Sequence, residues 1–69
     1  MDWINANSSN IERFAYDPVS RVLKVEFKNG GTYDYFDVSP SDFQRMCNAP
    51  SKGQFLASDI KGKYRYARA

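Results

Sequence analysis

The sequence predicts a single α+β domain, in which two short helices pack on one face of a small antiparallel sheet and the element order is β-β-β-α-α-β. Two observations predict this class. Residues 21–28 alternate apolar and polar side chains and run into Asn29-Gly30-Gly31, which is typical of a hairpin. Residues 39–43 then carry the signals of a helix start. A chain of 69 residues is the length of one domain.

Three strands are predicted before the helices, at residues 9–16, 21–28 and 32–37. Alternation in the first strand divides its side chains into Ile11, Arg13 and Ala15 on one face and Glu12, Phe14 and Tyr16 on the other. Asp17-Pro18 ends that strand. Leu23, Val25 and Phe27 form the apolar face of the second. Residues 1–7 are predicted to be a loosely held segment ahead of a domain at 8–69, although Trp3 and Ile4 could dock on it.

Two registers of the hairpin follow from two turn lengths. A two-residue turn at Asn29-Gly30 pairs Val25 with Asp34 and places Tyr33 and Tyr35 on the wet face. A three-residue turn that includes the next glycine pairs Val25 with Tyr35, so both tyrosines lie on the apolar face. The second register is favoured, because the first would bury a carboxylate opposite a valine. It predicts that the two tyrosines belong mainly to the core.

The first helix is predicted to begin at Ser39. Serine suits the N-cap, Pro40 suits the first helical position, and Asp42 occupies the capping-box position. An apolar stripe follows, and Pro50 ends the helix. Cys47 lies on this stripe, where a free cysteine acts as a small hydrophobe.

A second helix is predicted to begin at Ser51, with Gln54 at the matching capping position and Gly62 closing the helix. Residues 64–67 then form a short edge strand. Strand alternation would place Tyr64 and Tyr66 on one face of it, with basic side chains on the other.

Composition excludes several classes of protein. Without histidine and with one cysteine, the chain has no structural zinc set, no Ser-His-Asp arrangement and no internal disulfide, so neither an enzyme nor a cofactor is expected. No apolar run is long enough to span a membrane and no signal peptide is evident, so a cytoplasmic protein is expected. A domain this short needs extra stabilisation, and its five Phe, five Tyr and one Trp point to aromatic packing.

Positive charge is concentrated near the C-terminus. Residues 52–69 contain five basic side chains and one acid, although the net charge of the whole chain is only +2. A basic end can attract an anionic partner, and it can equally be a solvated surface that keeps the protein soluble.

Two groups of residues are candidates for binding. Ser51-Lys52-Gly53 could hold an anion at the start of the second helix, or could be only a cap and a tight corner. The second group could stack bases and contact phosphates, or could be an edge strand with its tyrosines facing inward. It comprises Lys61, Lys63, Tyr64, Arg65, Tyr66 and Arg68.

An ordered series of short motifs across residues 8–66 resembles the KTSC domain family. The series is Ser8-Ser9, Ile11, Tyr16-Asp17, Leu23, Val25, Phe27, Gly31, Tyr33-Asp34-Tyr35, Val38, Ala49, Ser51-Lys52-Gly53, Phe55, Ile60 and Tyr64. The family is named for the C-terminal domain of some lysyl-tRNA synthetases and includes stand-alone bacterial and phage proteins. One departure is Ser39-Pro40, where the family more often has proline directly after the valine, which should shift only the helix start. The resemblance implies this fold and no established activity, with RNA binding suggested by the synthetase association.

The sequence therefore favours a small non-enzymatic module that binds nucleic acid, single-stranded RNA first of all. Phosphates would be contacted by Lys52, Lys61, Lys63, Arg65 and Arg68, bases would stack on Tyr64, Tyr66 and Tyr35, and Gly53 would allow close approach. Two other hypotheses stay open: a protein-binding module, such as a phage-encoded inhibitor of a host protein, and an oligomer that sequesters a nucleotide signal.

Overall fold

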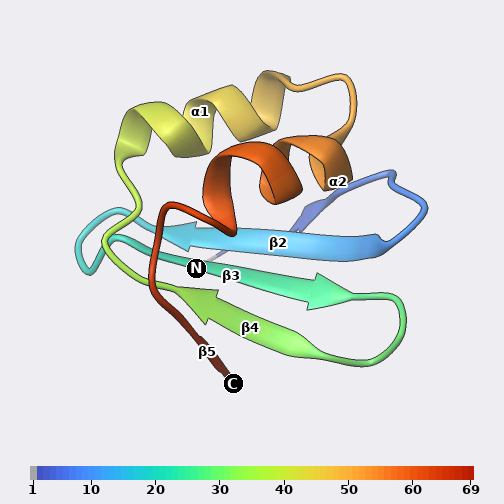
Figure 1. Ribbon diagram of the computed structural model, residues 1–69, viewed down its shortest axis with the longest axis horizontal. Coiled ribbons are helices and arrows are strands. Elements are labelled where there is room, and N and C mark those ends of the chain that lie inside the picture. The colour runs from blue at the N-terminus through green and yellow to red at the C-terminus, as the bar shows by residue number, and fades with distance from the viewer. Residues whose placement is uncertain (1) are drawn as a thin grey trace.

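The computed structural model describes residues 2–69 as one five-stranded antiparallel sheet with helices on one side (Figure 1). The strands run in sequence order across the sheet: β1 (Ile4–Asn5), β2 (Ile11–Asp17), β3 (Val22–Phe27), β4 (Thr32–Tyr35) and β5 (Tyr66–Arg68). Between β4 and β5 come α1 (Pro40–Asn48), α2 (Lys52–Phe55) and a π-helical turn, η1 (Leu56–Ile60). The α+β prediction is confirmed, and β1 adds an edge strand within the segment predicted to be loosely held.

The core lies between the sheet and the helices. Eight side chains in it are fully buried: Ile11, Phe14, Leu23, Val25, Val38, Met46, Leu56 and Ile60. Aromatic packing extends it, since the rings of Tyr16 and Phe43 stack with their centroids 4.5 Å apart. The Tyr16 hydroxyl donates to the carbonyl oxygen of Val38 at 2.6 Å, which ties β2 to the start of α1.

A β-bulge corrects the predicted faces of β2. Ile11 pairs with Phe27 and Phe14 with Val25, so two residues lie between Ile11 and Phe14 where the partner strand has one. The extra residue brings Ile11 onto the same face as Phe14, whereas simple alternation placed them on opposite faces. Both side chains are consequently buried in the core.

The hairpin between β3 and β4 has neither of the two predicted registers. Its loop is Lys28–Gly30: the amide N–H of Phe27 donates to the carbonyl oxygen of Gly31 at 2.7 Å, and Gly30 has φ +103°. The three-residue loop starts one residue earlier than in the favoured register. Val25 therefore pairs with Tyr33 rather than with Tyr35, two residues away. A displacement of two residues keeps the same face, so both tyrosines still lie on the apolar side, as predicted.

Both predicted helix starts are confirmed. The Ser39 side chain accepts the Asp42 amide N–H at 3.1 Å, and the Ser51 side chain accepts that of Gln54 at 3.3 Å. The second helical segment does not end at a left-handed glycine, because Gly62 lacks a positive φ. Residues 61–63 form a turn and Tyr64 a bend instead, so the last strand begins at Tyr66 rather than Tyr64.

Candidate functional site

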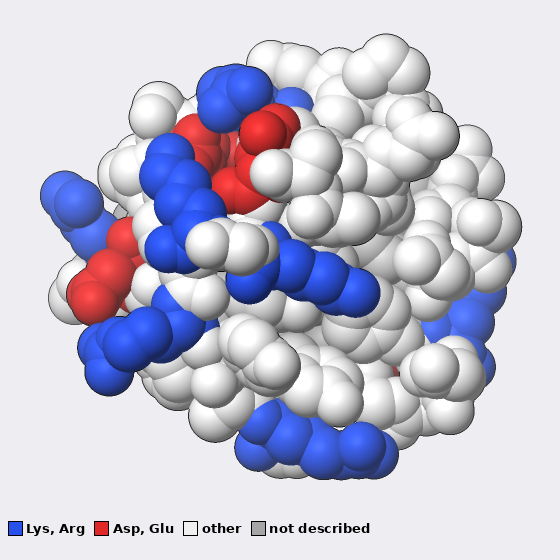
Figure 2. Space-filling view, viewed as in Figure 1, with Lys and Arg blue, Asp and Glu red and all other residues white. Residues whose placement is uncertain are grey.

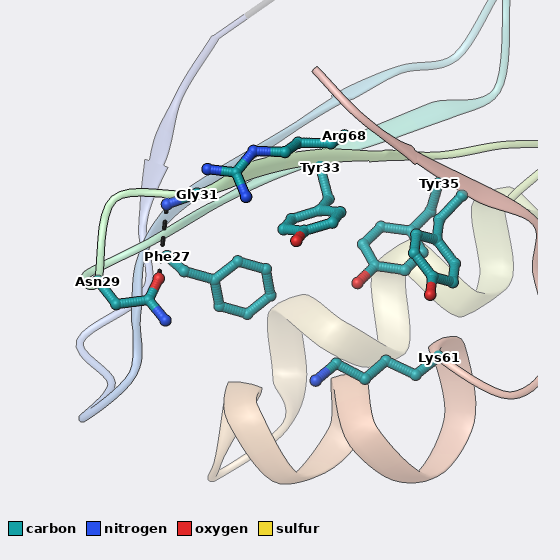
Figure 3. Close-up of a pocket in the computed structure, with 8 residues that line it drawn as sticks. Phe27, Asn29, Gly31, Tyr33, Tyr35, Lys61 and Arg68 are labelled. Carbon is teal, nitrogen blue, oxygen red and sulfur yellow. Dashed lines mark hydrogen bonds between the residues drawn. The ribbon is translucent and has the colours of Figure 1, made fainter.

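Aromatic rings and two cations enclose a pocket of about 460 Å³ at the β3–β4–β5 side of the sheet. We call it the aromatic recess and define it by Phe27, Tyr33, Tyr35, Tyr66, Lys61 and Arg68. Figure 3 shows the rings side by side, with Arg68 on one side of them and Lys61 reaching from the end of the helical segment on the other. The recess joins residues from three strands and the end of η1.

The sheet register places these rings together. Tyr35 pairs with Tyr66 across β4 and β5, and their ring centroids are 5.7 Å apart. Tyr33 lies between two further rings, at 5.9 Å from Tyr66 and 5.8 Å from Phe27. Tyr35 is 2% exposed and forms the floor, whereas Tyr66 is 58% exposed and forms an open wall. A planar group could lie against Tyr66 without displacing the core.

The two cations lie over rings of the recess. The Lys61 ammonium is 5.6 Å from the centroid of Phe27, and the Arg68 guanidinium carbon is 5.8 Å from that of Tyr33. Neither side chain forms an ion pair with any residue of the described range 2–69. Their charge is therefore free to attract an anionic ligand.

Glycine keeps the rim of the recess open. A Cβ atom on Gly31 would lie 3.2 Å from Cε1 of Tyr33 and 3.8 Å from a terminal nitrogen of Arg68.

Burial raises the pKa of the Tyr35 hydroxyl above its usual value, and the neighbouring Tyr66 and Tyr33 raise it further. At neutral pH the floor of the recess is thus an uncharged hydroxyl that can donate or accept a hydrogen bond.

Tyr64 and Lys63 lie in a second cluster, around Asp42. The Tyr64 hydroxyl and the Lys63 ammonium both donate to Oδ2 of Asp42, and Arg45 donates to Oδ1 at 3.1 Å. Asp42 is only 4% exposed. The hydrogen bond from Tyr64, followed by that from Lys63, holds the pKa of this carboxyl below its usual value, and Asp42 in turn raises the pKa of Lys63.

This cluster corrects the predicted pairing of Tyr64 with Tyr66. Tyr64 precedes β5 and lies in the turn after η1, so strand alternation does not apply to it. Its hydroxyl contacts α1, whereas Tyr66 stands in the recess. The two tyrosines do not form one stacking surface.

The remaining predicted residues lie apart from the recess. Arg65 is 3.5 Å from Asp37 in an exposed ion pair. The Lys52 ammonium donates to the carbonyl oxygens of Ala49 at 2.8 Å and Cys47 at 3.1 Å, at the end of α1. A Cβ atom on Gly53 would lie 2.5 Å from Oδ1 of Asn10, so this glycine permits close packing of the turn before β2. The Ser51 cap matches the structural alternative for Ser51-Lys52-Gly53, whereas Gly53 faces the turn before β2 and not a corner between the helices.

Sequence reasoning missed two of the residues that define the recess, Phe27 and Tyr33, and two more that line it, Asn29 and Gly31. Phe27 and Tyr33 had been assigned to the core, and the other two to a turn. The available signal was their shared position at one end of the hairpin, but that position becomes informative only with the correct register. The sequence indicates only a capping role for Asp42, because Lys63 and Tyr64, which bond to its Oδ2, are more than 20 positions away.

The surface charge is spread rather than continuous. Figure 2 shows basic side chains at separate points of the face seen in Figure 1, with uncharged surface between them and acidic side chains beside some of them.

Cys47 is partly buried, and burial raises the pKa of its thiol, so it remains a neutral thiol at neutral pH. Within residues 2–69, no helix has the length and apolar character needed to cross a bilayer.

Comparison with known proteins gives consistent results. Residues 7–64 match the family model described as KTSC domain. A KTSC domain protein of Yersinia pestis, known from its crystal structure, superposes with a TM-score of 0.94 at 35% identity, over 99% of this chain and 96% of that one. The same fold is thus present over nearly the whole length of both chains.

Sequence relatives fall into two kinds. The lysine–tRNA ligase of Nostoc punctiforme is 40% identical over 63 residues, which is 91% of this chain but 11% of the ligase. The chain therefore spans about a tenth of the curated ligases it matches. A protein of Tsukamurella paurometabola is 38% identical over 58 residues, covering 84% of this chain and 87% of that protein. The domain thus occurs both inside a ligase and in a protein of its own size.

Proposed function

The chain belongs to the KTSC domain family, and from that premise we propose that it is a small non-enzymatic module that binds single-stranded RNA in the aromatic recess. The observation that carries the proposal is that the exposed Tyr66 ring lines the same recess as two cations, which lie over Phe27 and Tyr33 and lack ion pairs among the described residues. Stacked bases and neutralised phosphates are the two interactions on which single-strand binding depends.

The assignment of residues differs from the one based on sequence. Tyr66 and Tyr33 are the stacking surfaces, Tyr35 supports them from below, and Lys61 and Arg68 contact phosphates. Lys63 is held by the nearly buried Asp42, and Arg65 lies apart from the recess beside Asp37, so both contribute less to binding. Lys52 caps α1 and Tyr64 anchors the turn before β5, and neither is needed for contact with RNA.

RNA rather than another polyanion is favoured by the sequence relatives. Lysine–tRNA ligases act on tRNA, as their name states, and carry a copy of this domain within a much longer chain. A module that holds a single-stranded part of an RNA would serve such a ligase as an additional contact. The isolated domain would use the same recess on an RNA of its own.

The test is a salt-dependent binding titration with a short single-stranded RNA. Affinity should fall linearly on a log–log plot between about 50 and 200 mM salt. Loss of two phosphate contacts in a Lys61→Ala/Arg68→Ala variant should reduce the slope by about 1.4, since each contact to a single strand contributes about 0.7. Duplex RNA and single-stranded DNA serve as comparison ligands.

The matched control removes the same charge elsewhere. Arg13 pairs with Glu26 on the outer side of the sheet, and Arg21 lies in the β2–β3 turn at the opposite end of the strands. Arg13→Ala/Arg21→Ala should leave the slope near that of the wild type. Equal weakening by both double variants, or an affinity that does not depend on salt, would contradict the proposal.

A protein partner is the second candidate, and one observation favours it. All three residues of β5 are exposed, and β5 is an edge strand with one side unpaired in the sheet. An extended segment of another protein could add to such an edge. The backbone of residues 65 and 69 bonds to β4 and the residue that follows it, so the N–H groups of Tyr66 and Arg68 point to the unpaired edge. Co-purification with a specific protein that a proline at Arg68 abolishes, with no RNA binding, would support this function in place of the first.

A further inference from the structure

A second hollow of about 440 Å³ adjoins the aromatic recess. We call it the polar hollow and define it by Ser9, Asn10, Phe27, Lys28, Asn29 and Lys61. Phe27, Asn29 and Lys61 line both spaces, so the two share a wall. The side chains that belong to the polar hollow alone come from the turn before β2 and from the β3–β4 loop.

Hydrogen bonds of the backbone and of two asparagine side chains fix the shape of the polar hollow. The Lys28 amide N–H donates to the carbonyl oxygen of Asn10 at 2.9 Å, which ties the two loops together. The Ser8 hydroxyl donates to Oδ1 of Asn10 at 2.9 Å, and Gly53 leaves room for this side chain. Oδ1 of Asn29 accepts the Gly31 amide N–H at 3.4 Å (Figure 3). In both asparagines the oxygen is thus engaged and the NH₂ group can donate to a ligand.

The charge of the two spaces is of one sign. Lys28, Lys61 and Arg68 line them, and no acidic residue of the described range 2–69 does. The recess offers rings to a planar group, whereas the polar hollow offers amide and hydroxyl groups. These two adjoining surfaces fit a ligand that has an anionic backbone, one base that stacks and another group that accepts hydrogen bonds.

We propose that the aromatic recess and the polar hollow together hold two consecutive nucleotides of a single strand. The first base stacks in the recess against Tyr66 and Tyr33, and the second nucleotide lies in the polar hollow. Lys61, at the shared wall, and Lys28, in the polar hollow, contact the phosphate that joins the two nucleotides. This inference rests on the proposed function and defines the length of RNA that the site recognises.

Binding of 5′-phosphorylated oligoadenylates of increasing length tests it, by calorimetry and by amide chemical shifts in NMR spectra. Adenosine 5′-monophosphate should shift the amides near Gly31 and Tyr66. The dinucleotide should bind about tenfold more tightly and should add shifts at Ser9, Asn10 and Lys28. The trinucleotide should add little beyond the dinucleotide.

A charge variant separates the two halves of the site. Lys28→Ala should remove most of the gain from mononucleotide to dinucleotide and leave mononucleotide affinity unchanged. Arg21→Ala, which removes an equal charge at the other end of the strands, should change neither affinity.

The outcomes distinguish this inference from the proposed function. If mononucleotide and single-stranded RNA bind at the recess but the dinucleotide gains nothing, or shifts amides elsewhere, the two-nucleotide site is wrong and the recess remains. If neither the oligoadenylates nor the RNA binds, the proposed function fails and this inference fails with it.

Discussion

Tyr64 and Tyr66 are two positions apart in the chain but belong to regions of opposite character. The Tyr64 hydroxyl bonds to a nearly buried carboxylate together with an ammonium group, so the polar end of this side chain is fully used by the fold. The Tyr66 ring is 58% exposed and contacts other rings, in a recess whose cations, Lys61 and Arg68, lack ion pairs within residues 2–69. The difference separates tyrosines that hold the domain together from those available to a ligand, and a variant of each region should affect a different measurement.

The largest expected effect is on stability, from Asp42→Ala. This change leaves the Tyr64 hydroxyl and the Lys63 ammonium without their shared acceptor. We expect the free energy of unfolding to fall by about 3 kcal/mol, the lower end for a broken buried charge network, because Lys63 and Arg45 can regain water. Urea denaturation measures the loss. A change below about 1 kcal/mol would show that the Asp42 cluster does not anchor the C-terminal segment.

Acid should reveal the same cluster through its pH dependence. The pKa of Asp42 is lowered in the folded state, so its contribution is complete above the unfolded value of about 3.9 and is lost as the pH falls through the folded pKa. The stability difference between the wild type and Asp42→Asn should therefore be constant near neutral pH and shrink below about pH 4. Denaturant titrations of both proteins at a series of pH values measure it. A difference that persists at the lowest pH would assign the effect to packing rather than charge.

Tyr66→Ala should affect binding rather than stability. Loss of one stacking surface weakens single-strand binding by about 1–3 kcal/mol, or roughly 5- to 150-fold. Tyr66→Phe keeps the ring and should keep the affinity. Tyr64→Phe is the matched variant from the other region: it should lower the free energy of unfolding by about 1.5–3 kcal/mol and leave the affinity of the folded protein unchanged. If Tyr64→Phe weakened binding as much as Tyr66→Ala, the two regions would be one site.

Local signals were enough to predict part of the fold. Ser39-Pro40 and Ser51 were located correctly because a cap depends on its own side chain and an amide three positions later. The face of Tyr33 and Tyr35 was also predicted, because it depends only on whether the register shift is odd or even. The register itself was not predicted. It depends on a loop that starts at Lys28, and the positive φ that marks this loop at Gly30 is seen only in the structure.

The site was less predictable than the fold because its members are brought together over long distances. No local pattern connects Tyr64 with Asp42, or Tyr35 with Tyr66. Nor does a local pattern reveal the bulge in β2, which depends on the pairing with β3. Composition drew attention to aromatic residues and to basic residues near the C-terminus, and both kinds line the recess. It could not distinguish Lys61 and Arg68, which lack ion pairs in the described residues, from Lys63 and Arg65, which have them.

The smallest and sharpest test uses two adjacent glycines. Gly31→Ala puts a Cβ atom 3.2 Å from Cε1 of Tyr33 at the rim of the recess, without a positive φ. The lower entropy of the unfolded alanine chain, about 0.4–1 kcal/mol, offsets this contact, so stability should stay within about 0.5 kcal/mol of the wild type while RNA affinity falls a few-fold.

Gly30→Ala should do the reverse. Nothing lies within 4 Å of its Cβ position, but φ is +103°, a conformation that alanine rarely adopts. Stability should fall by about 1–3 kcal/mol and affinity should hold once the protein is folded. If both variants lost stability and affinity in proportion, the recess would be no more than part of the core. Opposite responses would establish it as a surface that the fold keeps open at Gly31, one residue from the glycine that turns the hairpin.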